Sequence, residues 1–487
     1  MEKRASIAVA FGDGIGPEIM EATLAVLKET GAQLDLHKVE IGEKVYLSGH
    51  LTGIESSTWE TLRNTRAFLK APITTPQGGG FKSLNVTIRT SLGLYANVRP
   101  CISFAPFVST KHPKMDVVIV RENEEDLYAG IEYRQTPDVC CSLKLISRQG
   151  SEKIIRYAFE YARQQVRKKV TCFSKDNIMK FSDGLFHSVF EEIAKEYPDI
   201  QNEHWIVDIG AAKLADTPEI FDVIVMPNLY GDILSDVAAQ ISGSVGLAGS
   251  ANIGSHGAMF EAIHGSAPRR AGQNLANPSG LMLAAVQMLV YLDQTDAAEQ
   301  MHNAWLTTIE EGIHTYDIYR DGVSKQKVGT KEFARAVVQN IGKKPQQLKP
   351  AVYRHAPPNK PAELKKSIPS SRELARELAR ELVGTDVFIY AHTDARAFEE
   401  KMQKCDTGLL KLTMITNRGA RTWPEGIPET SCIEQWRCRF QAKKGVRLDQ
   451  RETFRLLEAL HANGFDIIKT ENLYTFDGAP GFSSAHG

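Results

Sequence analysis

The chain has 487 residues, a formal net charge of −1, and 42% hydrophobic and 24% charged residues. This composition is ordinary for a globular protein in water, and the length predicts two to four domains. The balanced charge does not support a nucleic-acid partner, and no apolar run approaches the roughly 18 residues of a membrane-spanning helix. The chain has seven cysteines and no CxxC pair, and its N-terminus does not resemble a signal peptide. These features predict reduced thiols in the cytoplasm.

The predicted elements alternate between strand and helix from the first residues onward. Residues 5–31, ASIAVAFGDGIGPEIMEATLAVLKETG, predict a strand, a glycine-rich turn and an amphipathic helix. Further buried strands are predicted at 114–123, 168–177 and 221–229, with a helix at 151–165 among them. This alternation indicates an α/β fold.

After this pattern ends, a stretch rich in lysine and proline predicts an extended linker. The following segment, SRELARELARELVG, places Leu374, Leu378 and Leu382 four residues apart. We expect a helix docked by this leucine edge, with a solvated linker as the alternative. This part of the chain is divided into a linker and helix at 343–382 and a small α/β domain at 383–487.

The glycine-rich turn, GDGIGPE, follows a strand and opens a helix, as a dinucleotide-binding turn does. Its glycines, Gly12, Gly14 and Gly16, are spaced G-x-G-x-G, whereas the nucleotide fingerprint is G-x-G-x-x-G. By itself, the turn predicts a tight strand-to-helix connection and not a Rossmann fold.

Short polar and basic residues gather in the stretch KSLNVTIRTSLGLYANVRP. Ser83 and Asn85 stand beside Arg89, Arg99 follows, and a later strand adds Arg121. Guanidinium groups bind carboxylates through paired hydrogen bonds. A single arginine is more often a surface or ion-pair residue, but three of them near two short polar side chains predict a site for an acidic small molecule.

Acidic residues form a second group. The motif NLYGDILSD places Asp232 and Asp236 four residues apart after an apolar strand, so on a helix they share one face. Asp208, in HWIVDIG, also follows an apolar run. Carboxylates at the carboxyl ends of strands are able to hold a hard divalent cation. The alternative is a solvated helix face or a helix N-cap.

Tyr128 and Lys175 each follow an apolar run that predicts a strand. A lysine beside a metal-bound hydroxyl can act as a base, and a tyrosine can supply a proton. Either residue alone is more often structural.

Residues 260–280, FEAIHGSAPRRAGQNLANPSG, predict a loop of small residues with a basic end. Such a loop can wrap an adenosine, and adjacent arginines can bind an extra phosphate. A surface loop with two solvated arginines is the alternative. The residues of interest are His264, Gly265, Ser266, Arg269, Arg270 and Asn277.

Together, these stretches resemble the metal-dependent decarboxylating β-hydroxyacid dehydrogenases, which act on isocitrate, isopropylmalate and tartrate. The motifs GDGIGPE, RENEEDLYAGIE, NLYGDILSD, GSANIG and HGSAP occur in this order. The resemblance implies the non-Rossmann α/β fold of the isocitrate/isopropylmalate dehydrogenases. It also implies a large cofactor-binding domain at 1–94 and 244–342, a small domain with a dimer clasp at 95–243, and an intertwined homodimer.

A narrower likeness covers the C-terminal domain. Its stretches ITNRGARTWPEG, QWRCRF and TFDGAPGF resemble the appended domain of a bacterial subgroup of large homodimeric isocitrate dehydrogenases. No group of catalytic residues stands out there. A dimer-stabilising or regulatory role is therefore expected for this domain.

The resemblance further implies the substrate. Isopropylmalate enzymes present an apolar helix face where this chain has Ser83 and Asn85, so isocitrate is the implied acid. Arg89, Arg99 and Arg121 are then its carboxylate ligands.

The implied reaction is the oxidative decarboxylation of isocitrate to 2-oxoglutarate and CO₂, a step of the tricarboxylic acid cycle. Mg²⁺ or Mn²⁺, held by Asp232, Asp236 and Asp208 of the partner subunit, lowers the pKa of the substrate hydroxyl and stabilises the enolate. Lys175 of the partner subunit assists deprotonation during hydride transfer, and Tyr128 protonates the carbon.

The implied cofactor is NADP in preference to NAD. NAD-using relatives carry an acidic residue after HGSAP, where this chain has Arg269 and Arg270. Tyr316 and Arg320, one helical turn apart if their segment is helical, repeat a spacing of NADP-using isocitrate dehydrogenases. These groups are expected to bind the 2′-phosphate. The other implied cofactor contacts are Thr75, His264, Gly265, Ser266, Ala267 and Asn277.

Three alternatives remain. They are an NAD-dependent isocitrate dehydrogenase, a homoisocitrate or 3-isopropylmalate dehydrogenase, and a regulatory subunit that binds isocitrate without turnover. The regulatory subunit is disfavoured, because such subunits lose catalytic groups and this chain keeps Tyr128, Lys175, Asp208, Asp232 and Asp236.

Overall fold

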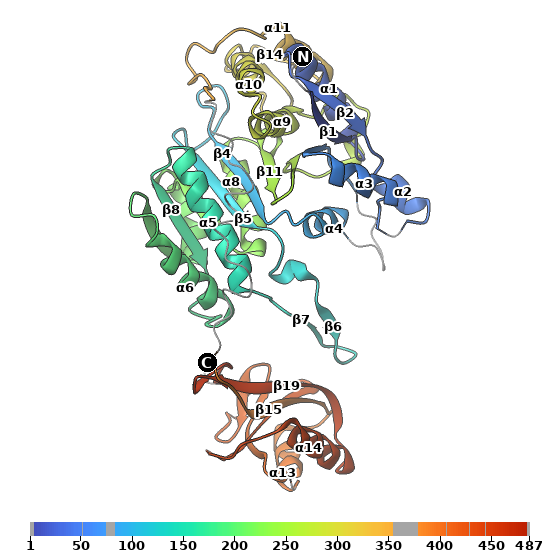
Figure 1. Cartoon of the computed structure of the whole chain (residues 1–487), viewed down its shortest axis with the longest axis vertical. Coiled ribbons are helices and arrows are strands. Elements are labelled where there is room, and N and C mark those ends of the chain that lie inside the picture. The colour runs from blue at the N-terminus through green and yellow to red at the C-terminus, as the bar shows by residue number, and fades with distance from the viewer. Residues whose placement is uncertain are drawn as a thin grey trace. The chain divides into compact units, whose positions relative to one another are not determined.

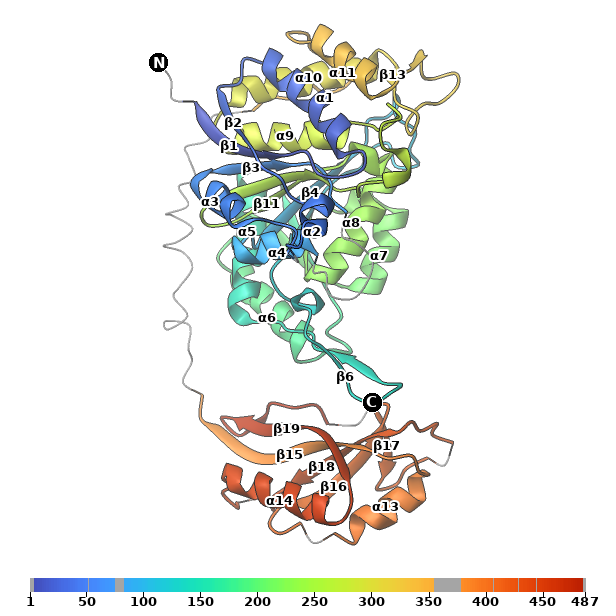
Figure 2. The same cartoon turned by 90° about the vertical axis from the view of Figure 1, so that its right-hand side faces the viewer.

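The structure, a computed structural model, describes residues 4–50, 52–74, 83–353, 378–405, 407–427, 429–443 and 445–484. The chain divides into two compact units (Figures 1 and 2). The first comprises Met1–Ala129 and Lys144–Ser370, and the second comprises Gly130–Leu143 and Ser371–Gly487. None of the helices in the described ranges has the length and hydrophobicity that a membrane crossing requires.

Ten strands form a mixed sheet in the first unit. They are β1 Ala5–Ala10, β2 Leu34–Lys38, β3 Ala67–Lys70, β4 Ala96–Ile102, β5 Asp116–Glu122, β8 Lys169–Ser174, β9 Gln201–Ile206, β10 Val223–Met226, β11 Gly249–Ile253 and β12 Ala258–Ala262. Their order is β2-β1-β3-β12-β11-β4-β5-β10-β8-β9. The first four strands of this order are mutually parallel, as are the last four. Antiparallel pairing through β11 and β4 joins the two groups.

Side chains of this sheet alternate between its two faces, because successive residues of a strand point to opposite sides. Ile7 and Val9 of β1 belong to one large apolar cluster, whereas Ala8 and Ala10 belong to another on the opposite face. Burial of both faces explains the nearly continuous apolar strands, which are typical of a sheet covered by helices on each side.

Helices cover both faces of the sheet (Figure 1). One face packs on α1 Gly16–Glu29, α5 Arg148–Gln164, α6 Ser182–Ala194, α9 Ser279–Tyr291, α10 Thr295–Glu310 and α11 Thr330–Gln339. The other packs on α2 Glu43–Leu47, α3 Ser56–Asn64, α4 Leu84–Ser91, α7 Val207–Asp216 and α8 Asn228–Ser242. Short elements of this unit are η1 Leu127–Ala129, η2 Pro218–Ile220, η3 Val245–Leu247, η4 Pro268–Arg270, β13 Ile313–His314 and β14 Gln326–Lys327.

The second unit contains an antiparallel sheet of six strands. They are β15 Arg380–Tyr390, β16 Lys411–Asn417, β17 Ala420–Trp423, β18 Gln435–Gln441, β19 Asp466–Phe476 and β20 Ala479–Pro480, in the order β17-β16-β18-β15-β19-β20. Two helices, α13 Ala395–Gln403 and α14 Gln450–Ala462, share an apolar cluster with it, in which the Phe398 and Trp436 rings stack 4.5 Å apart. A hairpin of β6 Glu132–Arg134 and β7 Cys140–Ser142 belongs to the same unit.

The α/β fold and the strands predicted from the sequence are confirmed, but the predicted leucine-edged helix is wrong where the structure describes it. Leu374 lies outside the described residues. Leu378 precedes β15, and Leu382 lies within β15, paired with Tyr474 of β19. Strand pairing with β19 supplies backbone hydrogen bonds and a partly buried place for Leu382, and this tertiary context overrides the helical period.

Candidate functional site

Arg121, Tyr128 and Asp232 meet near the carboxyl end of β5. Tyr128 lies on η1, which follows β5, and Asp232 lies on α8, which follows the neighbouring strand β10. The helix approaches β5 closely, because a Cβ atom on Gly231 would lie 2.5 Å from Arg121 Cγ. A glycine at this position thus allows the Asp232 carboxylate to reach the Arg121 guanidinium.

Asp232 accepts hydrogen bonds from three side chains. Its Oδ1 accepts from Arg121 Nη1 and, at 3.4 Å, from Arg99 Nη2. Its Oδ2 accepts from the Tyr128 hydroxyl at 2.5 Å. Arg99 and Arg121 are both buried, so Asp232 serves as a counter-charge for two cations that have little contact with water.

The same contacts shift the acidities of the group. Burial alone raises the pKa of Asp232, but the charges of Arg121 and Arg99 outweigh burial and lower it below its usual value. Burial, assisted by the hydrogen bond to Asp232, raises the pKa of Tyr128. Near neutral pH, Tyr128 is therefore a protonated donor and Asp232 an ionised acceptor.

Asp236 lies one turn beyond Asp232 on α8. Partial burial raises the pKa of Asp236 and the charge of Asp232 adds to the shift, while Arg99, 3.4 Å away, opposes it. The Asp236 side chain is 61% exposed, so an ion from solvent can reach it. Two mutually repelling carboxylates with hard oxygen donors open to water fit the ligand preference of Mg²⁺ or Mn²⁺.

Arg99, on β4, is also held by neutral partners that the sequence analysis missed. Its Nε donates to Asn97 Oδ1 at 2.6 Å and its Nη1 to Ser235 Oγ at 2.5 Å. Asn97 in turn donates at 3.0 Å to Asn252, its opposite residue on β11. The asparagine in this apolar strand could have indicated such a contact from the sequence, because a buried amide needs a hydrogen-bond partner.

The helix α4 carries the other predicted substrate residues. Arg89 Nη2 donates to Glu261 Oε1 at 2.9 Å, and Lys70 Nζ lies 2.8 Å from Glu261 Oε2. Burial raises the pKa of Glu261, but Lys70 and Arg89 outweigh burial and hold it well below the usual range. Asn85 Oδ1 and Arg89 Nε are buried without a hydrogen-bond partner among the described residues, and a polar ligand could satisfy both. Ser83 immediately precedes α4 and is exposed.

Lys175 and Asp208 form an ion pair with each other. Lys175 follows β8, and its Nζ donates to Asp208 Oδ1 on α7 at 2.6 Å. The hydrogen bond from Lys175 lowers the pKa of Asp208. Within the described part of one chain, Asp208 does not join Asp232 and Asp236 in a group of three close ligands. Of the three predicted metal ligands, Asp232 and Asp236 are thus neighbours, and Asp208 of the same chain is not close to them.

The glycine-rich turn packs against the loop that follows β12. Ile15 N donates to Ser266 O at 2.8 Å, and Thr74 Oγ1 lies 2.7 Å from Ser266 Oγ. Gly14 has a φ of +59°, and a Cβ atom there would lie 2.1 Å from Ser266 O. Glycine is therefore required at this contact. Thr75, a predicted cofactor residue, lies outside the described residues.

The predicted phosphate-binding groups do not all meet. Arg270, on η4, donates from Nη1 to the Tyr316 hydroxyl, and its guanidinium lies 4.8 Å from the centre of that ring. Arg320 donates instead to Ser109 Oγ at 2.6 Å, because residues 316–318 form a turn and no helix joins Tyr316 to Arg320. Arg269 is exposed. The arrangement leaves Arg270 and Tyr316 as one preformed pair.

Two further cofactor candidates hold contrasting positions. Asn277 is engaged, donating to Asp317 Oδ2 at 3.0 Å. Burial lowers the pKa of His264, and its Nε2 atom is buried without a partner among the described residues. Gly265 and Ala267 beside it are exposed. A neutral imidazole with an unpaired nitrogen, next to open backbone, fits a polar ligand such as a nucleotide.

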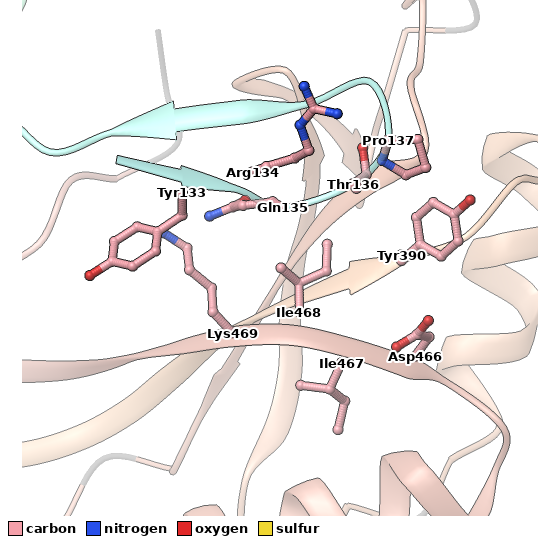
Figure 3. A pocket seen from close by; sticks show the side chains of 10 residues that line it. All are labelled: Tyr133, Arg134, Gln135, Thr136, Pro137, Tyr390, Asp466, Ile467, Ile468 and Lys469. Carbon is pink, nitrogen blue, oxygen red and sulfur yellow. The ribbon is translucent and has the colours of Figure 1, made fainter. Parts of the chain in front are cut away.

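The second unit has a cavity of about 660 Å³ (Figure 3). It is bounded by residues 133–137 of the β6–β7 hairpin, by Tyr390 of β15 and by residues 466–469 of β19. In Figure 3, the Lys469 side chain extends toward the hairpin. None of the predicted site residues lines this cavity, so it is separate from the candidate active site.

Two of the comparisons with known proteins cover nearly the whole chain. A curated isocitrate dehydrogenase [NADP] from Rickettsia bellii is 56% identical over 483 residues, 99% of each chain. A crystal structure of a protein from Thermus thermophilus superposes with a TM-score of 0.90 at 42% identity, covering 99% of this chain and 95% of that one. Isocitrate dehydrogenase from Methylococcus capsulatus gives 0.66 at 43% identity, over 69% of this chain and 99% of that chain.

Two family descriptions account for the two parts of the sequence. Residues 380–487 match the bacterial isocitrate dehydrogenase C-terminal domain. Residues 6–337 match isocitrate/isopropylmalate dehydrogenase. The chain therefore belongs to the isocitrate/isopropylmalate dehydrogenase family and carries the C-terminal domain of its bacterial isocitrate dehydrogenases.

Proposed function

We propose that this chain catalyses the oxidative decarboxylation of isocitrate to 2-oxoglutarate and CO₂, with NADP as the oxidant. The observation that carries the proposal is the convergence of Arg99, Arg121 and Tyr128 on Asp232, with Asp236 one turn away. Buried guanidinium groups suit the carboxylates of the acid, and the two aspartates supply oxygen ligands. The relatives named isocitrate dehydrogenase [NADP] support this choice of acid and cofactor.

The proposed substrate contacts are Arg99 and Arg121, which contact the acids, and residues at α4. Arg99 and Arg121 are fixed by neutral and acidic partners, which preorganises them for carboxylate binding. Arg89 Nε and Asn85 Oδ1 have no hydrogen-bond partner in the described part of the chain, which supports a role for both in ligand binding. Ser83 completes the set at the start of α4.

The aspartates Asp232 and Asp236, with Asp208 of the partner subunit, would hold Mg²⁺ or Mn²⁺, which lowers the pKa of a bound hydroxyl and stabilises the negative charge left when CO₂ departs. Tyr128 is protonated, because burial raises its pKa, and its hydroxyl is held by Asp232. This protonation state supports the proposal that Tyr128 would deliver a proton to the carbon. Lys175 of the partner subunit would take up the proton of the substrate hydroxyl.

We infer that two chains share each active site. In one chain Lys175 and Asp208 bond to each other and not to Asp232 or Asp236. Apolar side chains beside these acids are exposed on the same helices: Ile209 of α7 is 53% exposed and Ile233 of α8 is 54% exposed. Exposed apolar side chains of this size mark a protein interface when they cluster. A second copy covering α7 and α8 would bury them and bring Asp208 toward the acids of its partner.

The preference for NADP over NAD is supported by the Arg270–Tyr316 pair and by the absence of an acid after HGSAP. The proposed division into a large domain at 1–94 and 244–342 and a small domain at 95–243 falls between β11 and β4, where the two parallel groups of strands meet. We place the protein in the cytoplasm, where its free cysteines would stay reduced.

Initial rates of the purified chain with isocitrate, homoisocitrate and 3-isopropylmalate test the choice of acid. Isocitrate should give the highest kcat/KM. A higher value for 3-isopropylmalate or homoisocitrate would reassign the substrate pocket, and no turnover of any of the three would contradict the proposal.

A further inference from the structure

Asp176, His187 and His204 form a cluster apart from the residues of the proposed reaction. Asp176 follows β8, His187 lies in α6 and His204 lies in β9. Asp176 Oδ2 is 2.7 Å from His187 Nδ1, and Asp176 Oδ1 is 3.9 Å from His204 Nε2. One ligand atom of each residue lies within 4.8 Å of the others, and no other three acids, histidines or cysteines in the described ranges meet this closely.

The two imidazole rings of this cluster are stacked. Their centroids are 3.5 Å apart and their planes differ by 17°. Two imidazolium ions at this separation would repel each other, so at least one ring is favoured in its neutral form. Burial and the nearby His187 lower the pKa of His204. A neutral imidazole is the form that binds metals.

We propose that this cluster, the Asp176–His187–His204 site, binds a transition-metal dication of the zinc class. One carboxylate and two imidazoles are ligands that suit Zn²⁺. In tetrahedral coordination, ligand atoms about 2.0–2.2 Å from the metal lie about 3.3–3.6 Å from each other. The observed separations fall on either side of this range, although each runs to a different oxygen of Asp176: 2.7 Å from His187 Nδ1 to Oδ2 and 3.9 Å from His204 Nε2 to Oδ1.

The side chains can reach a common centre by small movements. The rings are nearly parallel, so their nitrogens must turn toward one another. That turn is a rotation about χ2, which has broad energy wells in histidine. The side chains of Asp176, His187 and His204 are 21%, 22% and 16% exposed, which leaves access for the ion and for a water ligand.

The surroundings supply a second layer of hydrogen bonds. Glu191 Oε1 lies 3.6 Å from His187 Nε2, one turn along α6. With Nδ1 of His187 on the metal, Nε2–H would donate to this carboxylate, an arrangement that orients many metal-binding histidines. His204 Nε2 now lies 2.8 Å from Ser174 Oγ, and on metal binding it would exchange this contact for the metal.

Mg²⁺ is not the expected occupant, because it prefers oxygen ligands and nearly octahedral geometry. The Asp176–His187–His204 site and the Asp232–Asp236 pair should therefore select different ions. This inference does not depend on the proposed reaction, since binding can be measured without turnover.

Isothermal titration of the full chain with ZnCl₂, in excess MgCl₂, tests the proposal. We expect about one Zn²⁺ per chain at this site, and an affinity at least about tenfold weaker in His204→Asn and in Asp176→Asn. Asp176→Asn keeps the side-chain shape, so it tests the ligand if His204→Asn is unstable. Visible absorption of Co²⁺ bound in place of Zn²⁺ should disappear in the same variants.

Two controls isolate the site. His37→Asn removes a histidine that also has a carboxylate and a hydroxyl nearby, since His37 Nε2 lies 3.3 Å from Asp35 and 2.6 Å from Ser6 Oγ. Zinc binding should be unchanged in this variant and in Asp232→Asn. The proposal is overturned if the wild-type chain binds no zinc, or if His204→Asn and Asp176→Asn bind it as tightly as the wild type.

Discussion

Replacing Asp232 by asparagine should abolish most of the activity while preserving the shape of the site. The asparagine side chain fills the same space but carries no charge. In the structure, the Asp232 carboxylate accepts from Tyr128 at 2.5 Å, from Arg121, and from Arg99 at 3.4 Å. The substitution weakens all three contacts and removes one charged ligand of the proposed cation.

The expected loss of activity follows from the contacts that Tyr128 and Arg121 make with Asp232. A hydrogen bond to a charged group contributes about 1.5–3 kcal/mol, so the contacts from Tyr128 and Arg121 together represent about 3–6 kcal/mol. At about 1.4 kcal/mol for each factor of ten, kcat/KM for isocitrate should fall roughly 10²–10⁴-fold. Arg99 and Arg121 remain buried with one counter-charge fewer, so the variant should also be less stable, by about 1–3 kcal/mol.

Steady-state kinetics with NADP and saturating Mg²⁺ or Mn²⁺ measure the first effect, and urea unfolding followed by circular dichroism measures the second. Asp35→Asn is a matched control that should leave both quantities unchanged, because Asp35 of β2 and its partner His37, 3.3 Å away, are both exposed side chains. A correctly folded Asp232→Asn protein with kcat/KM within about threefold of the wild type would refute the reasoning.

Four further outcomes are expected. Mixing inactive Lys175→Ala with inactive Tyr128→Phe under conditions that exchange subunits should restore one intact site per heterodimer, and no recovery despite proven exchange would count against shared sites. Arg269→Asp with Arg270→Ile should lower kcat/KM for NADP far more than for NAD, whereas an equal loss for both would remove the phosphate assignment. A chain that ends after Tyr353 keeps the contact between Tyr353 and His302 but lacks the C-terminal domain. We expect it to dimerise less strongly or to unfold more easily than the full chain. A stable, fully active dimer of this shorter chain would exclude an assembly role for the C-terminal domain. Lys70 and Arg89 depress the pKa of Glu261 in the folded state, so the stability that these contacts contribute is present above the unfolded pKa of about 4.3 and is lost as the pH falls below that value. Urea titrations should show a smaller loss of stability at low pH for Glu261→Gln than for the wild type. An identical pH profile for the two proteins would contradict this prediction.

The elements that the sequence predicted best are those whose residues repeat a local pattern. The apolar strands of the first unit alternate between two buried faces, and the strand-turn-helix of residues 5–31 has both the pattern and the glycines it needs. The leucine spacing that ends at Leu382 failed, because a period of four indicates a helix only when no strand competes for those residues. The competing strand, β19, lies about ninety residues later and leaves no local trace.

The sequence offered candidate site residues but not the contacts that join them. The aspartates of α8 and the arginines of β4 and β5 were recognisable from spacing and residue type. Their neutral partners, such as Asn97 and Ser235, could not be, because each contact joins elements far apart in the chain. Glu261 was likewise missed, since a single acid in an apolar strand does not identify Lys70 and Arg89 as its partners.

The most direct test of the proposed reaction is an initial-rate assay of the purified full-length chain with isocitrate, Mg²⁺ or Mn²⁺, and NADP or NAD in parallel. We expect isocitrate-dependent reduction of NADP, with one 2-oxoglutarate formed per NADPH, a lower kcat/KM with NAD, and loss of the reaction when a chelator removes the cation. A higher kcat/KM with NAD would contradict the cofactor assignment, and folded protein that reduces neither cofactor would contradict the account as a whole.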